Sequence, residues 1–311
     1  MIKRTLCFSN PAYLSLANSQ LVIKLPEVEK STMPDSFKQN AVRTIPVEDI
    51  GIVILDHTQI TITQGLLEAL LENNCAVITC DKSHLPVGLL LPLCGNYTQS
   101  ERFRYQIEAS LPLKKQLWQQ TISAKILNQA AVLHNVRKVE TGNMSAWADR
   151  VKSGDSDNME ARAAAYYWKN AFPQNPHFVR DREGQIPNNL LNYGYAILRA
   201  VVARALVASG MLPTLGIHHR NKYNAYCLAD DIMEPYRPYV DKFVMDIYDT
   251  NPSVQELTTE LKRALLEIPV LDVTIQGKRS PLMIAVSTTT ASLYRCFAGE
   301  SRKILYPTID E

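Results

Sequence analysis

The chain has 311 residues, 46% of them hydrophobic, and its 33 basic and 31 acidic side chains give a formal net charge of +2. This length lies near the point where one core usually divides into two, and a near-neutral charge is not the signature of a dedicated non-specific nucleic-acid binder. No stretch approaches eighteen consecutive apolar residues, so we expect a cytoplasmic protein with no membrane span.

The first part of the chain is predicted to be mostly β-strand. One helix is expected at TQGLLEALLENN, where the leucines from Leu66 to Leu71 form an apolar stripe. The polar segment 26–40, PEVEKSTMPDSFKQN, holds two prolines and no period, which predicts a loop. Short β-branched or alternating segments bounded by turn residues predict strands at TLCFSN, AYLSLAN, QLVIKL, VRTIPVED, GIVILD, CAVITC and VGLLLPL.

The pattern becomes helical after Gly95. The segment up to His134 carries apolar residues at helical spacing, interrupted by Pro112, which is expected to kink or break the helix. We therefore predict an α+β fold, with a small β-rich domain over residues 1–95 and a larger all-α catalytic domain over residues 96–311. Further helices are expected at about 157–171, 188–209, 225–245, 253–267 and 281–298.

Glu160 is the first candidate for chemistry. A helix with Ser156 or Asp157 as its N-cap places Glu160 on an apolar stripe. A carboxylate on an inward face is costly unless it is paired or bound to a cation. The alternative is a first-turn glutamate that only complements the helix dipole. The other members of the stripe are Ala163, Ala164, Tyr167 and Trp168.

A second cluster lies in GIHHRNKYNAYCLADDIMEPYRPYVDKF. The adjacent His218 and His219 precede a helix in which Asp231 and Glu234 share a face. Adjacent side chains of an extended loop point in opposite directions, so one of the two histidines is expected to face that helix. Pro235 is expected to bend the helix beside Glu234. Imidazole with carboxylates is a normal ligand set for Mg²⁺ or Mn²⁺, and the alternative is a satisfied histidine pair beside a solvated acidic face.

Taken together, these segments resemble the CRISPR-associated spacer integrase family, the adaptation endonucleases, and in particular its branch associated with type II single-effector systems. NMEARAAAYYWKN resembles the glutamate helix of the family, and PAYLSLANSQLVI resembles its first β-hairpin. The stretch from NNLLNYGYAIL to MEPYRPYVD resembles its histidine and acidic motifs. The resemblance continues to SPLMIAVSTTTASLYRCFAGE near the end of the chain.

The resemblance implies that Glu160, His219 and Glu234 are both the catalytic residues and the ligands of Mg²⁺ or Mn²⁺. Asp231 and His218 would be auxiliary. The family often has aspartate at the position of Glu234, which keeps the charge. The implied activity is that of a DNA endonuclease and integrase, which inserts short foreign DNA into a CRISPR repeat array by attack of a 3′-hydroxyl on a phosphodiester.

The resemblance also implies partners. They are double-stranded DNA, as prespacer and repeat array, a second copy of the chain bound through the β-rich domain, and a small ferredoxin-like CRISPR-associated subunit that completes a heterohexamer. Duplex DNA requires phosphate neutralisation. The basic side chains nearest to the expected site are Arg162, Lys169, Arg220, Lys222 and Arg237.

The residues by themselves leave two other functions open. A metal-dependent phosphohydrolase could use the HH and DD pairs on small nucleotides, and it would need a concave pocket without basic flanks. A DNA-binding scaffold could hold the same three side chains for structural reasons and catalyse nothing.

Overall fold

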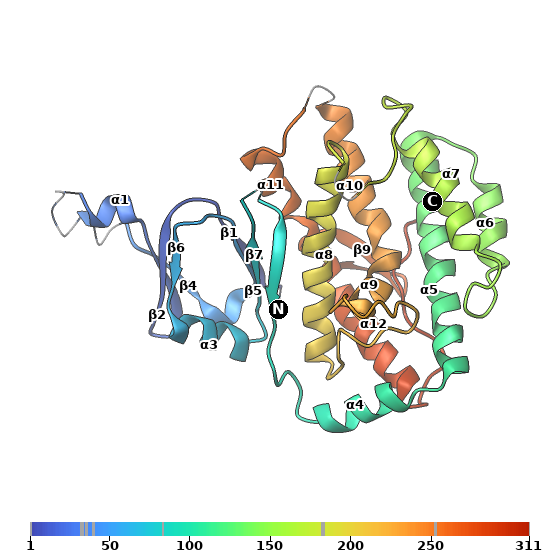
Figure 1. The fold of residues 1–311 in the computed structure, drawn as a ribbon, viewed down its shortest axis with the longest axis horizontal. Helices are drawn as coiled ribbons and strands as arrows, with labels where there is room; N and C mark the ends of the chain where they lie inside the picture. The colour runs from blue at the N-terminus through green and yellow to red at the C-terminus, as the bar shows by residue number, and fades with distance from the viewer. Residues whose placement is uncertain are drawn as a thin grey trace. The chain divides into compact units, whose positions relative to one another are not determined.

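The structure, a computed structural model, describes residues 2–31, 34, 37–38, 41–82, 84–181, 184–251 and 254–310. The chain divides into two compact units, Met1–Gly95 and Asn96–Glu311. We call them the β unit and the helical unit. Figure 1 shows the strands of the first and the helices of the second.

The β unit contains two four-stranded sheets. In the first, of order β1-β5-β7-β8, the strands β1, β5 and β7 are parallel and β8 is antiparallel to β7. In the second, of order β4-β3-β2-β6, β6 is parallel to β2 and the other pairs are antiparallel. The strands are β1 (Arg4–Phe8), β2 (Ala12–Ala17), β3 (Gln20–Lys24), β4 (Arg43–Pro46), β5 (Ile50–Leu55), β6 (Ile60–Ile62), β7 (Ala76–Cys80) and β8 (Pro86–Leu90).

The predicted leucine helix of the β unit is α3 (Gln64–Glu72). Its Leu66 and Leu70 are fully buried, in one core cluster with residues of both sheets such as Leu14 and Val53. The strand β6 was not predicted, because three residues are too short to show alternation.

The segment 26–40 was predicted to be a loop throughout, and this was wrong at its start. The short helix α1 (Pro26–Glu29) opens there with proline in its first turn, where the missing amide proton costs nothing. Residues 32, 33, 35, 36, 39 and 40 of the segment lie outside the described residues. A single 3-10 turn, η1 (Val47–Asp49), ends the segment predicted as the strand VRTIPVED.

The helical unit is mostly helical, but the prediction that it is all-α was wrong. It also contains an antiparallel hairpin of β9 (Asp272–Ile275) and β10 (Lys278–Pro281). Pro112 breaks the first helical segment as expected, since it lies in the first turn of α5, after the end of α4. The helices are α4 (Gln99–Glu108), α5 (Leu111–Val132), α6 (Gly142–Asp149), α7 (Met159–Ala171), α8 (Asn188–Ala208), α9 (Cys227–Met233), α10 (Arg237–Thr250), α11 (Thr259–Leu265) and α12 (Leu282–Phe297). Shorter turns are η2 (Leu133–Arg137), η3 (Glu234–Tyr236) and η4 (Ile268–Val270).

The core of the helical unit lies around α8. This helix packs against α10, α9 and α12, and α10 packs in turn against α5 (Figure 1). By length and composition α8 could cross a membrane, but 78% of its most apolar window is buried inside the protein, which is typical of a core helix. The faces of α5, α7 and η3 that meet beside this core carry the candidate residues.

Candidate metal centre

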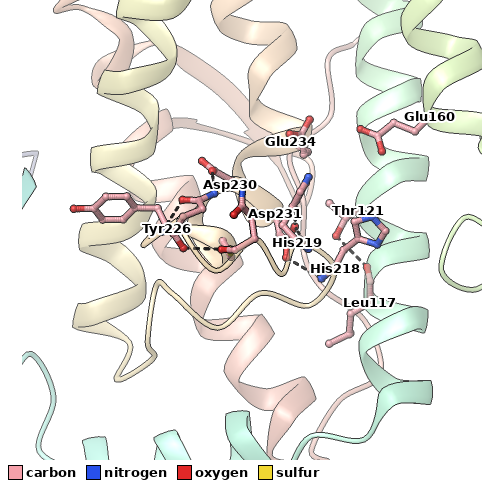
Figure 2. Close-up of polar contacts among 12 residues, drawn as sticks. Leu117, Thr121, Glu160, His218, His219, Tyr226, Asp230, Asp231 and Glu234 are labelled. Carbon is pink, nitrogen blue, oxygen red and sulfur yellow. Dashed lines mark hydrogen bonds and ion pairs between the residues drawn. The ribbon is translucent and has the colours of Figure 1, made fainter. Parts of the chain in front are cut away.

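Glu160 is the second residue of α7. The expected N-cap, Ser156 or Asp157, was wrong: Asn158 occupies the N-cap position in a left-handed conformation and makes no side-chain cap bond. The capping acceptor is Asp155, whose carboxylate accepts the backbone N–H groups of Met159 at 2.8 Å and Glu160 at 3.0 Å. The Glu160 side chain is 27% exposed and extends from α7 toward the side on which Glu234 and His219 lie (Figure 2).

Glu234 stands where the helix breaks. The predicted helix 225–245 is two helices, α9 and α10, joined by the 3-10 turn η3, because Pro235 cannot donate the next hydrogen bond. The Asn128 side chain of α5 donates to the Pro235 carbonyl at 2.8 Å, which fixes the turn against α5. Glu234 is only 5% exposed.

His219 is held by Asp231, which is fully buried. The Asp231 carboxylate accepts the backbone N–H groups of His218 at 2.9 Å and His219 at 3.2 Å. It also pairs with His219 Nδ1 at 2.5 Å, and this hydrogen bond, against the opposing effect of burial, raises the pKa of His219. The loop can approach this closely because residue 216 is glycine: a Cβ there would lie 2.4 Å from the His219 carbonyl oxygen and 2.7 Å from Asp231 Oδ2.

His218 turns to a different neighbour. Its ring stacks on the buried Trp118 of α5, with ring centroids 4.1 Å apart and an interplanar angle of 4°. Burial lowers the pKa of His218. One of the two histidine side chains was expected to face the acidic helix, and the ring that pairs with its Asp231 is that of His219. The two rings nevertheless stay in edge-to-face contact, with centroids 5.3 Å apart, and the His219 ring also meets Trp118 edge-on at 5.6 Å.

Lys125 of α5 joins the two glutamates, and the sequence analysis missed it. Its Nζ lies 2.6 Å from Glu160 Oε1 and 2.6 Å from Glu234 Oε2. Burial opposes the charge of Lys125, but Glu234 and Glu160 outweigh burial and raise its pKa. One signal was present: Lys125 is the only charged residue between positions 116 and 133, and it follows the buried Leu117 and Thr121 at steps of four.

Arg237 is the second cation at Glu234. Its Nε lies 2.9 Å from Glu234 Oε1, and its guanidinium lies over the Tyr195 ring. Burial pushes the pKa of Glu234 upward, but Arg237 and Lys125 outweigh burial and lower it. The other oxygen, Glu234 Oε2, is buried and lies 2.6 Å from the Lys125 ammonium. Arg237 was predicted to contact DNA. In the structure its guanidinium pairs with the Glu234 carboxylate, and the prediction of a DNA contact remains untested.

The candidate ligands share one electrostatic site. Glu234 and Glu160 both raise the pKa of His219, and His219 lowers the pKa of Glu234. Among the described residues, no three His, Cys, Asp or Glu side chains converge as a ready ligand set. The reason is visible in the pairs: Lys125 stands between the two glutamates, and Asp231 holds His219 at Nδ1.

This donor set fits a divalent cation. The two carboxylates bind one ammonium, so their nearest oxygens are no farther apart than twice 2.6 Å. Two oxygen ligands of one metal ion are separated by at most about 5 Å, because each lies about 2.0–2.6 Å from the metal. Both carboxylates already bind a cation, the Lys125 ammonium, which is a second sign that the site suits one.

A hollow of about 420 Å³ adjoins His219. It is lined by Lys114, Arg220 and Lys222 and by no Asp or Glu among the described residues. Partial burial and the neighbouring Arg220 lower the pKa of Lys114. Two of these three cations were predicted from the sequence, and Lys114 was not. The remaining lining residues are Ile107, Thr214, Leu215, Gly216, Asn221, Asn224 and Cys227.

The two other predicted basic residues lie on α7. Arg162 and Lys169 are exposed, and the guanidinium of Arg162 lies 5.9 Å from the Trp147 ring centroid. The aromatic residues between them are divided: Tyr167 is fully buried, whereas Tyr166 is partly exposed and donates to the Glu140 carbonyl.

Comparison with known proteins agrees with this architecture. The chain matches the family model described as CRISPR associated protein Cas1 over residues 6–266. It is 36% identical to the CRISPR-associated endonuclease Cas1 of Neisseria meningitidis serogroup C, over 98% of this chain and 95% of that protein.

Two solved structures share its fold. A casposase bound to an integration product has a TM-score of 0.79 at 19% identity, covering 98% of this chain and 92% of that one. A Cas6-RT-Cas1–Cas2 complex has a TM-score of 0.74 at 19% identity, covering 97% of this chain and 35% of that one. The fold, with β-sheets first and helices after them, is thus shared with the casposase and with part of the Cas6-RT-Cas1–Cas2 complex.

The chain belongs to the Cas1 family, the endonucleases and integrases of CRISPR adaptation. The family resemblance drawn from the motifs is therefore confirmed. Membership in this family favours the endonuclease and integrase over the two other functions that the residues alone left open, the nucleotide phosphohydrolase and the non-catalytic scaffold.

Proposed function

We propose that this chain is the metal-dependent DNA integrase and endonuclease that inserts short foreign DNA into a CRISPR repeat array. The observation that carries the proposal is the meeting of Glu160 and Glu234 on one cation, in a chain that belongs to the Cas1 family. His219 lies in electrostatic reach of both glutamates.

Glu160, Glu234 and His219 would hold Mg²⁺ or Mn²⁺. Each carboxylate offers an oxygen to the cation, and His219 offers Nε2, because its Nδ1 pairs with Asp231. When bound, the metal supplies a Lewis acid for the scissile phosphate. Asp231 is the auxiliary residue that orients His219, and His218 supports the loop by packing on Trp118.

The reaction exchanges one phosphodiester for another. The 3′-oxygen of the foreign DNA bonds to a phosphorus at the border of the repeat, and the bond from that phosphorus to the 3′-oxygen of the repeat strand breaks. The proton of the attacking hydroxyl ends on the departing oxygen. With water as the attacking group, the same site hydrolyses DNA, which is the endonuclease activity.

Duplex DNA, as prespacer and repeat array, would approach over the cationic hollow. Arg220 and Lys222 line it beside His219, so they can neutralise phosphates adjacent to the reacting one. Arg162 and Lys169 are exposed on the helix of Glu160 and can meet the same duplex farther along. Arg237 would act on DNA only after its pairing with Glu234 changes.

The proposed assembly follows the family. The chain would form a homodimer through the β unit and bind a small ferredoxin-like subunit, completing a heterohexamer in the cytoplasm. The support is the Cas6-RT-Cas1–Cas2 complex, in which part of a longer chain has the same fold.

A strand-joining assay tests the function. The protein is mixed with its partner subunit, a labelled DNA fragment and a repeat plasmid, with and without Mg²⁺ or Mn²⁺. We expect joining only with metal, and a loss on the order of 100-fold or more in Glu160→Gln, His219→Ala and Glu234→Gln, because a metal contributes several kcal/mol to such steps.

The matched control is Glu108→Gln, an exposed glutamate of α4 in the same unit. It should join DNA like the unaltered protein, and all variants should retain their far-UV circular dichroism and DNA affinity. Full strand joining in any of the three site variants would show that the altered residue is not part of the catalytic site. Strand joining that does not depend on metal would overturn the proposal.

A further inference from the structure

Lys125 is a buried cation bound to the two glutamates of the proposed metal site. It is 9% exposed, and its Nζ makes ion pairs of 2.6 Å with both Glu160 and Glu234. A buried lysine normally needs such partners to remain charged, and Lys125 has two of them. One ammonium therefore holds α5, α7 and η3 together.

The charges around Glu234 are balanced without any metal. Two carboxylates, Glu160 and Glu234, face two cations, Lys125 and Arg237. A divalent ion added to this set would bring two further positive charges against a neighbouring ammonium in a largely buried site, where repulsion between like charges is strong. The ammonium and the metal also compete for the same carboxylate oxygens, Glu160 Oε1 and Glu234 Oε2.

We infer that Lys125 is the internal counter-ion of this site: it pairs with Glu160 and Glu234 when no metal is present, and it must leave them for a divalent cation to bind. The inference rests on the proposed metal site. It makes Lys125 a positioning residue, which keeps the two carboxylates together and lowers the affinity for metal.

Removal of the charge therefore has two opposite effects. Lys125→Met keeps the length and the apolar stem of the side chain, but it leaves two buried carboxylates without this partner. The metal-free protein should unfold at a lower temperature, and it should bind Mn²⁺ more tightly than the unaltered protein. A lysine with a purely structural role predicts the first effect without the second.

The test uses the full chain, freed of metal by a chelator and dialysed. Isothermal titration with Mn²⁺ gives the affinity, and thermal unfolding with and without Mn²⁺ gives the stability. We expect Lys125→Met to bind Mn²⁺ at least about 10-fold more tightly, because one like charge near the ion is removed. Lys125→Arg, which keeps the charge, should bind Mn²⁺ as weakly as the unaltered protein.

The matched control is Lys115→Met, an exposed lysine of the same helix, and it should change neither quantity. Mn²⁺ affinity in Lys125→Met that is equal to or weaker than that of the unaltered protein would overturn the inference. If Lys125→Met does not fold, Lys125→Gln replaces it. The unaltered protein supplies an independent measurement: Lys125 should be protected from acetylation without Mg²⁺ and lose protection with it, and unchanged protection contradicts the inference.

Failure of the metal site itself would look different. Glu160→Gln and Glu234→Gln should both weaken Mn²⁺ binding in the same titration. If these two variants bind Mn²⁺ as tightly as the unaltered protein does, the proposed metal site is wrong. If they lose Mn²⁺ while Lys125→Met gains nothing, the metal site stands and only the role of Lys125 falls.

Discussion

Asp231 organises the histidine loop at the scale of single residues. It is fully buried, and its carboxylate accepts three hydrogen bonds from His218 and His219. Its negative charge is therefore directed at the histidine loop. Gly216 makes this packing possible, because any side chain there would collide with the loop carbonyl or with the carboxylate. In the proposed metal site, Asp231 would therefore act on the metal through the orientation of His219.

The protonation of His219 follows from this contact. Its pKa is raised above 6.5, chiefly by the hydrogen bond to Asp231, so the imidazolium persists to higher pH than in an ordinary histidine. Since a protonated imidazole cannot bind metal, metal affinity should fall as pH decreases through the raised pKa. Asp231→Asn should lower the pKa of His219, as followed by NMR of the His219 Cε1 proton in the metal-free protein.

The control for this titration is Asp157→Asn, an exposed carboxylate that pairs with Lys152. It should leave the midpoint of His219 where it is. An unchanged His219 midpoint in Asp231→Asn would contradict the assignment of the shift to Asp231.

At the scale of elements, the sequence predicted what depends on local pattern. Pro235 predicted the break between α9 and α10, and Pro112 predicted the break before α5. Both predictions succeeded because proline disrupts helical hydrogen bonding only within a few residues of itself. The stripe of α7 was predicted from its spacing, and Ala163 and Tyr167 are indeed fully buried. The cap by Asp155 was missed, because it reaches Met159 across a loop rather than from the N-cap position.

Contacts between distant elements could not be predicted in this way. Glu160 and Glu234 were single candidates on separate helices, and their common partner Lys125 lies 35 residues before the first and still farther before the second. Periodicity identifies a buried face but not what that face meets. The family resemblance supplied the pairing of Glu160 with Glu234, whereas Lys125 and Lys114 belong to no motif that was recognised.

Asp241 of α10 joins three helices. It is 1% exposed and accepts hydrogen bonds from Tyr167 of α7 at 3.0 Å and from Tyr195 of α8. Burial raises its pKa from 3.8 to about 6, although the tyrosines and Arg237 oppose the shift. The helix of Glu160 and the helix that follows Glu234 are therefore tied through one carboxyl group.

This raised pKa predicts how stability depends on pH. Below pH 3.8 the carboxyl is protonated in the folded and the unfolded chain, and its contribution to stability is fully present. As pH rises through about 6 that contribution is lost, because the unfolded chain ionises first. The loss is at most ~3 kcal/mol, from about 1.4 kcal/mol per pKa unit.

Asp241→Asn removes the ionisation and keeps an oxygen acceptor for the tyrosines. The unaltered protein should therefore lose stability relative to Asp241→Asn between pH 4 and pH 7, by up to ~3 kcal/mol. Urea unfolding followed by circular dichroism at the two pH values measures the difference. A stability difference between the two proteins that is the same at both pH values would contradict the raised pKa.

At the scale of the whole molecule, the chain combines a β unit and a helical unit. All the residues of the proposed metal site, together with Lys125, lie in the helical unit. The change of pattern near Gly95 coincides with the boundary between the units. The described residues of the β unit include none of the proposed ligands, and the role expected for this unit from the family resemblance is dimerisation.

The edge strand β8 supports that role. It has one neighbour in its sheet, β7, and it exposes apolar side chains, with Val87 66% exposed and Leu90 37% exposed. Unprotected apolar edge strands are unusual on a monomer, because they pair with other chains.

The full chain should therefore run as a dimer in size-exclusion chromatography with light scattering, and Val87→Lys with Leu90→Lys should shift it toward the monomer mass. Val179→Lys is the control, since Val179 is 72% exposed in the helical unit and should leave the dimer intact. A monomeric unaltered protein, or a dimer that survives both β8 substitutions, would show that a different surface joins the copies.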